Sequence, residues 1–218
     1  MSYKSQNIAV YSGSFNPLHI GHLAIIRHMI EVAGFDMVYL IVSPKNPLKD
    51  GISSDSGRER YMAAVEAVER RFRHSILSAS GRNDNSEYLP APGRNDRKAV
   101  EARVKVDDIE LNMPEPHYTI RTLDALKERE PENIFTLVMG ADNLADIRRW
   151  RDYTRILEEY GVAVFPRKGH DLAEIKQDLL KEDPSYKIQI LDAEMVDISS
   201  TQIRNANADG EDISKYLM

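Results

Sequence analysis

The sequence predicts an α/β fold, in which an open parallel sheet carries helices on both faces. Three observations support this prediction. Short apolar runs typical of buried strands recur along the chain, and stretches with helical spacing of apolar residues separate them. The first strand, helix and second strand also follow one another within the first 42 residues. Such a unit makes its strands parallel with a right-handed crossover, so the continued alternation favours a Rossmann-like sheet.

The first of these units begins with the apolar run Asn7–Ser12, which Gly13 ends. The helix that follows is expected from apolar residues at helical spacing: Ile20, Leu23, Ile26, Ile30 and Ala33. Gly34 is expected to stop this helix, because glycine is common just beyond helix ends. The second buried strand is then predicted at Met37–Val42.

A longer helix is expected to begin near Arg58, after a loop rich in proline, serine and glycine. Its apolar face is predicted from Tyr61, Met62, Val65, Val68 and Phe72. The periodicity then ends between Ser78 and Lys98, in a polar segment that holds two prolines and repeats Gly-Arg-Asn-Asp. We interpret residues 78–98 as a polar insertion or flexible loop within one domain that spans residues 1–218.

The rest of the chain continues the alternation of strands and helices. The predicted elements are a strand over Ala102–Leu111, a helix over Thr119–Glu128, a strand over Ile134–Met139, two short helices over Leu144–Trp150 and Tyr153–Tyr160, a strand over Gly161–Phe165, a helix over Leu172–Lys181 and a strand over Tyr186–Leu191. Residues 199–218 are expected to form a helical C-terminal portion.

Composition excludes several classes of protein. The 218 residues include no cysteine, which rules out a disulfide scaffold, a thiolate zinc site and a cysteine nucleophile. The formal net charge of -6 argues against a long nucleic-acid interface. Neither a secretory signal pattern nor an apolar stretch of membrane-spanning length is found. We therefore expect a cytoplasmic protein without nucleic-acid or membrane partners; the sequence leaves open whether it forms a homo-oligomer.

The turn after the first strand holds the strongest chemical signal. In an open α/β sheet, ligands bind at the carboxyl ends of the strands. Gly13 allows a sharp turn there, and the following helix start offers free N–H groups and its positive dipole end to a phosphate. His19 and His22 are three residues apart, so both are expected to face the same side, with Gly21 keeping that side open. Two imidazoles beside a phosphate cradle suit a developing phosphoryl charge.

Other interpretations of this turn remain open at this point. A histidine near a helix start is often a surface or capping residue, and His19 with His22 could be half of a zinc site. The chain has no cysteine and no HExxH motif, so a metal cage of protein side chains is not predicted. The turn also lacks GxxxxGK[ST] and GxGxxG, the loops of P-loop and dinucleotide-binding proteins.

Two motifs resemble those of a known superfamily. Gly13–His22 resembles the GxFxPxHxGH signature of nucleotidyltransferases that act without a covalent enzyme intermediate, and Ile198–Arg204 resembles their second signature, ISSTxIR. Between them, His117–Leu123 and Leu137–Leu144, followed by Trp150, are similar to segments of the bacterial nicotinate mononucleotide adenylyltransferases. The resemblance covers nearly the whole chain outside residues 78–98.

The chain departs from this family at two places. The family often has two glycines before the Ser/Thr-Phe pair, and here the first of them is Ser12, which a negative φ would accommodate. The family's substrate loop often reads Pro-Pro-His-Lys, whereas this chain has Leu48 in place of the histidine. Lys49 is kept as a residue expected to face a phosphate.

The resemblance implies transfer of the adenylyl group of ATP to nicotinate mononucleotide, with Mg²⁺ carried by the ATP phosphates. The implied catalytic residues are His19, His22 and Arg204. The implied ATP- and phosphate-binding residues are Gly13, Ser14, Phe15, Ser200, Thr201 and Lys49. The implied nicotinate mononucleotide-binding residues are Tyr118, Thr119, Asp142 and Trp150. Arg167 and Lys45 are weaker candidates for nucleotide contact.

Rival interpretations accompany these assignments. Trp150 could be a partly buried core aromatic, and Asp142 could only cap a helix. The pairs Asp107–Asp108 and Glu158–Glu159 are interpreted as solvated faces, because adjacent side chains point in different directions. The substrate could instead be nicotinamide mononucleotide, a phosphopantetheine or a cytidylyl compound. A nucleotide-binding regulatory module without chemistry is the rival from another class.

Overall fold

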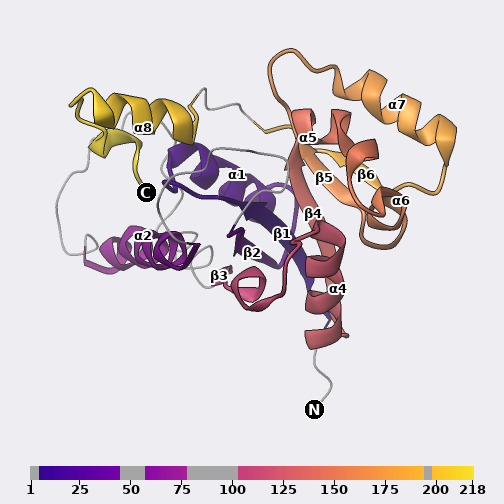
Figure 1. Cartoon of the computed structure of the whole chain (residues 1–218), viewed down its shortest axis with the longest axis horizontal. Helices are drawn as coiled ribbons and strands as arrows, with labels where there is room; N and C mark the ends of the chain where they lie inside the picture. The colour runs from indigo at the N-terminus through magenta and orange to yellow at the C-terminus, as the bar shows by residue number, and fades with distance from the viewer. Residues whose placement is uncertain (1–4, 45–56, 78–102, 194–197) are drawn as a thin grey trace.

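The computed structural model of the protein describes residues 5–44, 57–77, 103–193 and 198–218. Its centre is a parallel sheet of six strands in the order β3-β2-β1-β4-β5-β6 (Figure 1). The strands are β1 (Asn7–Gly13), β2 (Met37–Val42), β3 (Val104–Asp107), β4 (Ile134–Gly140), β5 (Val162–Phe165) and β6 (Ile188–Ile190). The order reverses between β1 and β4, which creates a switch point where open α/β sheets bind ligands. The Rossmann-like fold class is confirmed.

Both faces of the sheet are buried, which explains why its strands are continuous apolar runs. Side chains alternate along β1: Ala9 and Tyr11 join the core on one face, while Ile8 and Val10 join the core on the other. In the register of the sheet, Ile8 lies between Met37 of β2 and Phe135 of β4. The strand that leads to the predicted site is therefore the centre of both cores.

Helices cover both faces. On the first face, the buried sides of α1 (Ile20–Glu31) and α2 (Gly57–Leu77) pack in the same core as Ala9 and Tyr11. On the second, α4 (Thr119–Arg129), α5 (Ala141–Ala145) and α7 (Leu172–Glu182) contribute to the other core. The helix α8 (Ser200–Ala208) lies beside α1 (Figure 1). The short helical turns are η2 (Ile109–Asn112), η3 (Ile147–Arg149), α6 (Tyr153–Arg155), the π-helical η4 (Ile156–Tyr160) and η5 (Ser214–Tyr216).

Three predicted details are wrong. The strand expected over Ala102–Leu111 ends at Asp107, whose carboxylate accepts a hydrogen bond from the N–H of Ile109 and turns the chain into η2. The helix expected over Leu144–Trp150 is instead α5 followed by η3. Met62 is 55% exposed, because the buried side of α2 runs through Arg60, Ala64, Ala67 and Val68.

Asp107 is also not on a solvated face. Its side chain is buried and receives two hydrogen bonds from the guanidinium of Arg129, at 2.7 and 3.1 Å, and an ion pair from Lys105 at 2.9 Å. The end of β3 thus meets the end of α4, a contact between elements that the local sequence pattern did not reveal. Glu158 and Glu159 are exposed as predicted.

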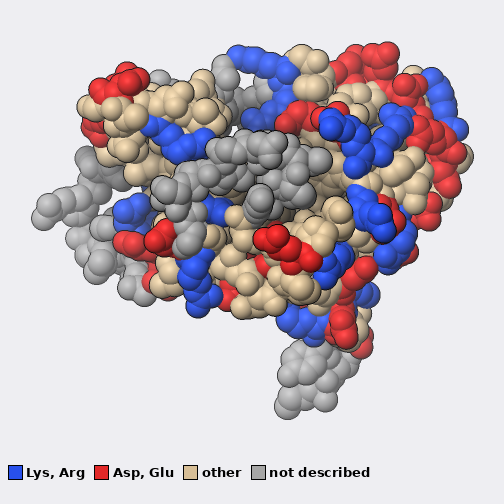
Figure 2. Space-filling view, viewed as in Figure 1, with Lys and Arg blue, Asp and Glu red and all other residues tan. Residues whose placement is uncertain are grey.

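The polar insertion predicted over residues 78–98 lies outside the described residues. Within the part of the chain that the structure describes, no helix is long and apolar enough to cross a membrane. On the face shown in Figure 2, acidic and basic side chains are interspersed.

Candidate active site

His19 and His22 stand together at the start of α1. His19 is the N-cap residue, and its Nδ1 accepts a hydrogen bond from the N–H of Gly21 at 3.2 Å. In return, Nδ1 of His22 accepts from the backbone N–H of His19, also at 3.2 Å. This reciprocal capping box brings the two ring centroids to 3.8 Å. The prediction that both rings face the same side is confirmed, and His19 is a cap as well.

The capping box selects one tautomer of each ring. A neutral imidazole carries its hydrogen on one nitrogen only, and both Nδ1 atoms serve here as acceptors. The hydrogen-bond pattern therefore assigns the proton of each neutral ring to Nε2. Since both rings line the same cleft, His19 and His22 each retain one N–H donor for a ligand.

Both rings are held uncharged in the absence of ligand. Burial lowers the pKa of His19 to about 4, and the nearby charge of Arg167 lowers it further in the same direction. Burial also lowers the pKa of His22 well below its ordinary value, with smaller contributions from His19 and Arg167. At neutral pH the cleft thus presents neutral N–H donors. A bound polyphosphate would favour the protonated, positively charged form of the two rings.

We expect the ligand-free protein to lose stability as the pH falls from 7 to 5. The pKa of His19 is about 4 in the folded protein, against 6.5 for the free side chain, so the unfolded chain binds a proton in this range that the folded protein excludes. For His19 alone the loss at pH 5 is on the order of 2 kcal/mol. Urea unfolding at both pH values measures it. His19→Asn keeps a capping side chain without a titrating ring and should lose less; an equal loss would contradict the expectation.

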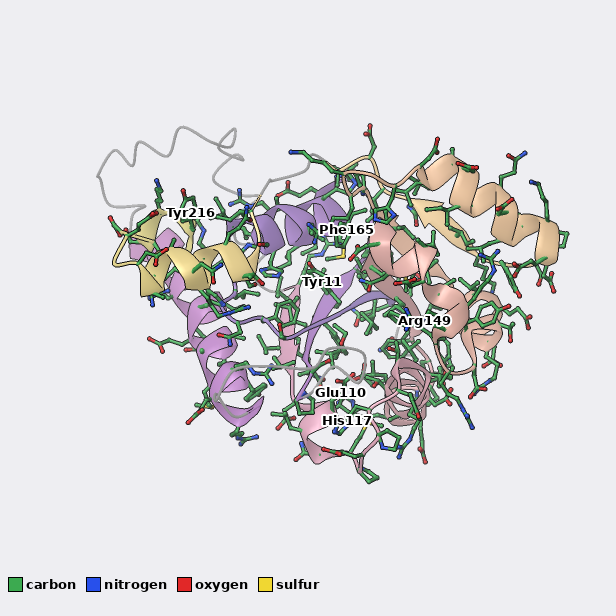
Figure 3. All side chains as sticks on the ribbon, turned by 45° about the horizontal axis from the view of Figure 1, so that its top comes forward. Tyr11, Glu110, His117, Arg149, Phe165 and Tyr216 are labelled. Carbon is green, nitrogen blue, oxygen red and sulfur yellow. The ribbon has the colours of Figure 1, made fainter. Side chains whose placement is uncertain are left out.

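The cleft beside the two histidines is bounded by α1, β5 and the start of α8. Its lining residues are Tyr11, His19, Gly21, His22, Ile25, Phe165, Pro166, Arg167, Ala193, Ile198 and Ser199. Tyr11 and Phe165 lie close together in the centre of the molecule, with ring centroids 6.1 Å apart (Figure 3). Burial raises the pKa of the Tyr11 hydroxyl, so that this group stays protonated. The lining of the cleft therefore combines aromatic rings with polar and aliphatic groups.

The turn from Gly13 to Phe15 supports His22. Phe15 has a positive φ of 42° and its ring is buried, edge-on to the ring of His22 at a centroid distance of 5.2 Å. A Cβ atom at position 13 would stand 3.2 Å from the Phe15 ring, so glycine makes room for this packing. Ser12 has no positive φ, as its side chain requires. The loop therefore supports the ring of His22 through Phe15, in addition to the close approach of its backbone to a ligand that the sequence predicts.

The second motif meets the first across the cleft. Ser199 caps α8, and Ser200 donates a hydrogen bond from its Oγ to the carbonyl of Pro17 at 3.2 Å. Arg204 donates from Nη1 to the carbonyl of Asn16 at 2.6 Å and from Nη2 to Oγ1 of Thr201 at 3.1 Å. The predicted group of Ser200, Thr201 and Arg204 is thus gathered on the first turns of α8 and fastened to the loop before α1.

Asp142 lies at the start of α5, directly after β4, and is close to Arg167. Its Oδ1 is 4.0 Å from Nε of Arg167, and a Cβ atom at position 140 would overlap the same carboxylate oxygen. The N-cap of α5 is Gly140, so capping is not the role of the Asp142 side chain. Arg167, which the sequence marks only weakly, lines the cleft.

The remaining predicted residues form a second group at the start of α4. Tyr118 is the N-cap of that helix and Thr119 its first residue. Trp150 is partly buried, and it packs against the same core as Tyr118. The guanidinium of Arg151 lies 6.0 Å from the Tyr118 ring centroid. Trp150 therefore has core contacts and an accessible part. Lys45, Leu48 and Lys49 lie outside the described residues.

Arg60 is a residue that the sequence reasoning missed. It is only 3% exposed, and its guanidinium donates to the carbonyls of Ser14 and Ser43, each at 2.8 Å, and of Pro44 at 2.7 Å. It thus ties the loop after β1 to the loop after β2. Arg60 lies on the same buried side of α2 as Ala64 and Ala67. The helical spacing of these three residues is a signal in the sequence that could have identified it.

The chain is similar to known proteins over nearly its whole length. A family model described as cytidylyltransferase-like matches residues 10–206, which include both motifs, and this defines the class of the protein. Two relatives named "Probable nicotinate-nucleotide adenylyltransferase" extend the match. The one from Flavobacterium johnsoniae is 35% identical over 96% of this chain and 91% of its own, and the one from Bacteroides fragilis 34% over 95% and 85%.

A solved structure is similar in fold. Plasmodium falciparum nicotinic acid mononucleotide adenylyltransferase complexed with NaAD has a TM-score of 0.68 and 19% identity, over 97% of this chain and 90% of that one. With its fold, its two motifs and these relatives, the chain belongs to the nicotinate-nucleotide adenylyltransferase family.

Proposed function

We propose that this protein transfers the adenylyl group of ATP to nicotinate mononucleotide, which yields nicotinate adenine dinucleotide and pyrophosphate in NAD biosynthesis. One observation carries the proposal: the start of α1, with His19 and His22, and the start of α8, with Ser199, meet at one cleft. Family membership supplies the identity of the substrates. The cytoplasm, where we expect the protein, suits such a step.

The reaction needs positioning more than proton transfer. A phosphate oxygen of the mononucleotide attacks the α-phosphorus of ATP; the new P–O bond forms as the bond to the β-phosphate oxygen breaks, and pyrophosphate leaves with that electron pair. The attacking phosphate is already ionised near neutral pH, so no strong general base is required. What the protein must provide is alignment of the two substrates and donors for the charge that develops on the phosphate oxygens.

The residues around the cleft suit these tasks. The Nε2–H groups of His19 and His22 would donate to the phosphate oxygens of ATP, and His22 is the one we assign to the transition state. The backbone of Gly13, Ser14 and Phe15 would line the same phosphates. Ser200, Thr201 and Arg204 would bind the β- and γ-phosphates. Arg204 now donates to Asn16 and Thr201, so a phosphate would engage its remaining donors or replace that contact.

Mg²⁺ would accompany the nucleotide. The polar groups lining the cleft are histidine, serine and arginine, which suit phosphate oxygens more than a bare cation. Within the described ranges no cluster of three or more metal-ligating side chains occurs, so these residues would hold the ion through the phosphates. When bound, the ion neutralises phosphate charge.

The group at the start of α4 suits the mononucleotide. Trp150 and Tyr118 would pack against the pyridine ring, and backbone N–H groups at the start of α4, near Thr119, would receive the nicotinate carboxylate. A carboxamide cannot accept those hydrogen bonds equally well. Asp142 would accept hydrogen bonds from ribose hydroxyls, and Lys49 would face a phosphate.

Pyrophosphate release tests the function directly. With ATP and Mg²⁺, we expect rapid release with nicotinate mononucleotide and much slower release with nicotinamide mononucleotide. No release with either would overturn the proposed function. Equal rates would leave adenylyl transfer standing and overturn the assignment of carboxylate recognition to the start of α4. Binding of ATP without any turnover would favour the regulatory module instead.

A further inference from the structure

A chain of hydroxyl groups joins a buried carboxylate to the ligand edge of the sheet. Glu110, in η2, is labelled in Figure 3 and is 3% exposed. It accepts hydrogen bonds from Oγ1 of Thr122 at 2.8 Å and from Oγ of Ser43 at 2.7 Å. The Oγ of Ser43 is in turn 2.9 Å from Oγ of Ser12. None of these side chains has a role in the site described above, where Ser43 contributes only its carbonyl to Arg60. Ser12 stands where the family often has glycine.

The direction of these hydrogen bonds follows from the number of available hydrogens. A carboxylate can only accept, so Ser43 must donate its single hydroxyl hydrogen to Glu110. The contact between the two serines therefore has Ser12 as its donor. With its hydrogen used in this way, the Oγ of Ser12 can only accept a hydrogen bond from a third group. Glu110 thus fixes the polarity of a hydroxyl two links away.

The acceptor stands at the edge of the sheet where open α/β folds bind their ligands. Ser12 is the penultimate residue of β1, and Ser43 directly follows β2. Both therefore stand at the carboxyl edge of the sheet, and both are partly exposed. The N–H of Ser43 donates to the carbonyl of Gly13 at 3.0 Å, which fixes the two strand ends relative to each other. The other partner of Glu110, Thr122, lies one turn after Tyr118 on α4. The chain of hydroxyls therefore connects to the residues at the start of α4 that we assign to the mononucleotide.

We propose that Ser12 binds a ribose hydroxyl of the mononucleotide and that Glu110 is the positioning residue that makes Ser12 an acceptor. The inference rests on the proposed function. The ionised phosphate and carboxylate of the mononucleotide have no hydrogen to donate, and the lone pairs of Ser12 repel them. Its two ribose hydroxyls are the groups that can donate. Ser12 thereby favours the orientation of the mononucleotide in which the sugar, and not the phosphate, lies over the end of β1.

The test couples a protein change to a substrate change. Wild type and Ser12→Ala are compared with nicotinate mononucleotide and with its 2′-deoxy and 3′-deoxy analogues. Loss of the hydrogen bond should raise the mononucleotide KM of Ser12→Ala about 5- to 10-fold, with little change in the KM for ATP. One deoxy analogue should show a similar penalty with wild type and none further with Ser12→Ala. Ser185→Ala, which changes an exposed serine far along the chain before β6, is the matched control. It should keep the wild-type KM for the mononucleotide and the wild-type penalty with the sensitive analogue.

Glu110→Gln tests the positioning role. The side-chain amide can donate to Ser43, which reverses the chain and turns the Ser12 hydrogen toward the ligand. The penalty of the sensitive analogue should then disappear while Ser12 is still present, an effect that a purely structural role of Glu110 does not produce. If this variant fails to fold, as a thermal melt would reveal, the Ser12→Ala comparison still decides.

The outcomes separate the two claims. An inactive wild type overturns the proposed function and this inference with it. An active wild type whose deoxy penalties are unchanged in Ser12→Ala overturns the inference alone. Loss of the penalty for one analogue, confined to the mononucleotide KM, supports it.

Discussion

Replacing His22 with alanine is expected to lower kcat about 100-fold or more while the fold stays intact, because a preorganised donor to a developing oxyanion is removed. The ring lies edge-on to Phe15 at 5.2 Å and its Nδ1 is occupied by the backbone N–H of His19, so its Nε2–H is fixed in direction before substrate arrives. A donor that needs no reorganisation contributes most in the transition state. The structural cost is smaller, since the variant loses one of the two capping hydrogen bonds of α1, worth about 1 kcal/mol.

Steady-state kinetics with ATP and nicotinate mononucleotide measure this loss, and circular dichroism checks the fold. His28→Ala is the matched control, because His28 lies in the last turn of the same helix, away from the cleft. It should retain wild-type kcat. Near-normal turnover of a folded His22→Ala protein would show that the charge of the transition state is stabilised by other groups.

Replacing Arg60 with alanine is expected to destabilise the protein by about 3 kcal/mol or more, because hydrogen bonds from a charged donor to three carbonyls are lost together. These carbonyls belong to the loops after β1 and β2, which are separated in the sequence by α1 and β2. The variant should also lose activity beyond its loss of stability, since Ser14 and the backbone around it form the loop that we propose to bind the ATP phosphates.

Arg58→Ala provides the comparison for Arg60. It removes an arginine two residues away on α2 whose 3.1 Å ion pair with Asp108 is exposed. Such surface pairs contribute about 0–1 kcal/mol. Urea unfolding of both variants at the same pH gives the two values. Similar small losses for both would mean that the buried guanidinium of Arg60 does not hold the two loops together.

The fold was predictable because its signals are local. The runs Asn7–Ser12 and Met37–Val42 are apolar throughout, as strands buried on both faces must be, and the helix between them shows its spacing directly. The end of β3 was not predictable in the same way. Asp107 alternates with apolar residues like a solvated strand residue, and only the approach of Arg129 from α4 makes its burial possible.

The candidate site was predictable where its residues are close in sequence. His19 and His22 are one helical turn apart, and the glycine at position 13 signals the turn before them. Arg60 and Glu110 were missed, because their partners lie on other elements. Glu110 lies in η2, beyond the end of β3, so the alternation of the strand does not mark it as buried, and no sequence pattern pairs it with Ser43.

By itself, then, the sequence determined the parallel α/β sheet, the turn after the first strand and the two motifs, since each depends on residues within one or two turns of chain. The tertiary structure decided which groups meet: Ser200 with Pro17 across 183 positions, Arg60 with two loops, and Ser12 with Glu110 through Ser43. Hydrogen bonds between distant segments are selected by the assembled sheet, which fixes where strands end. Their donors and acceptors therefore carry no local signal of the partner they will find.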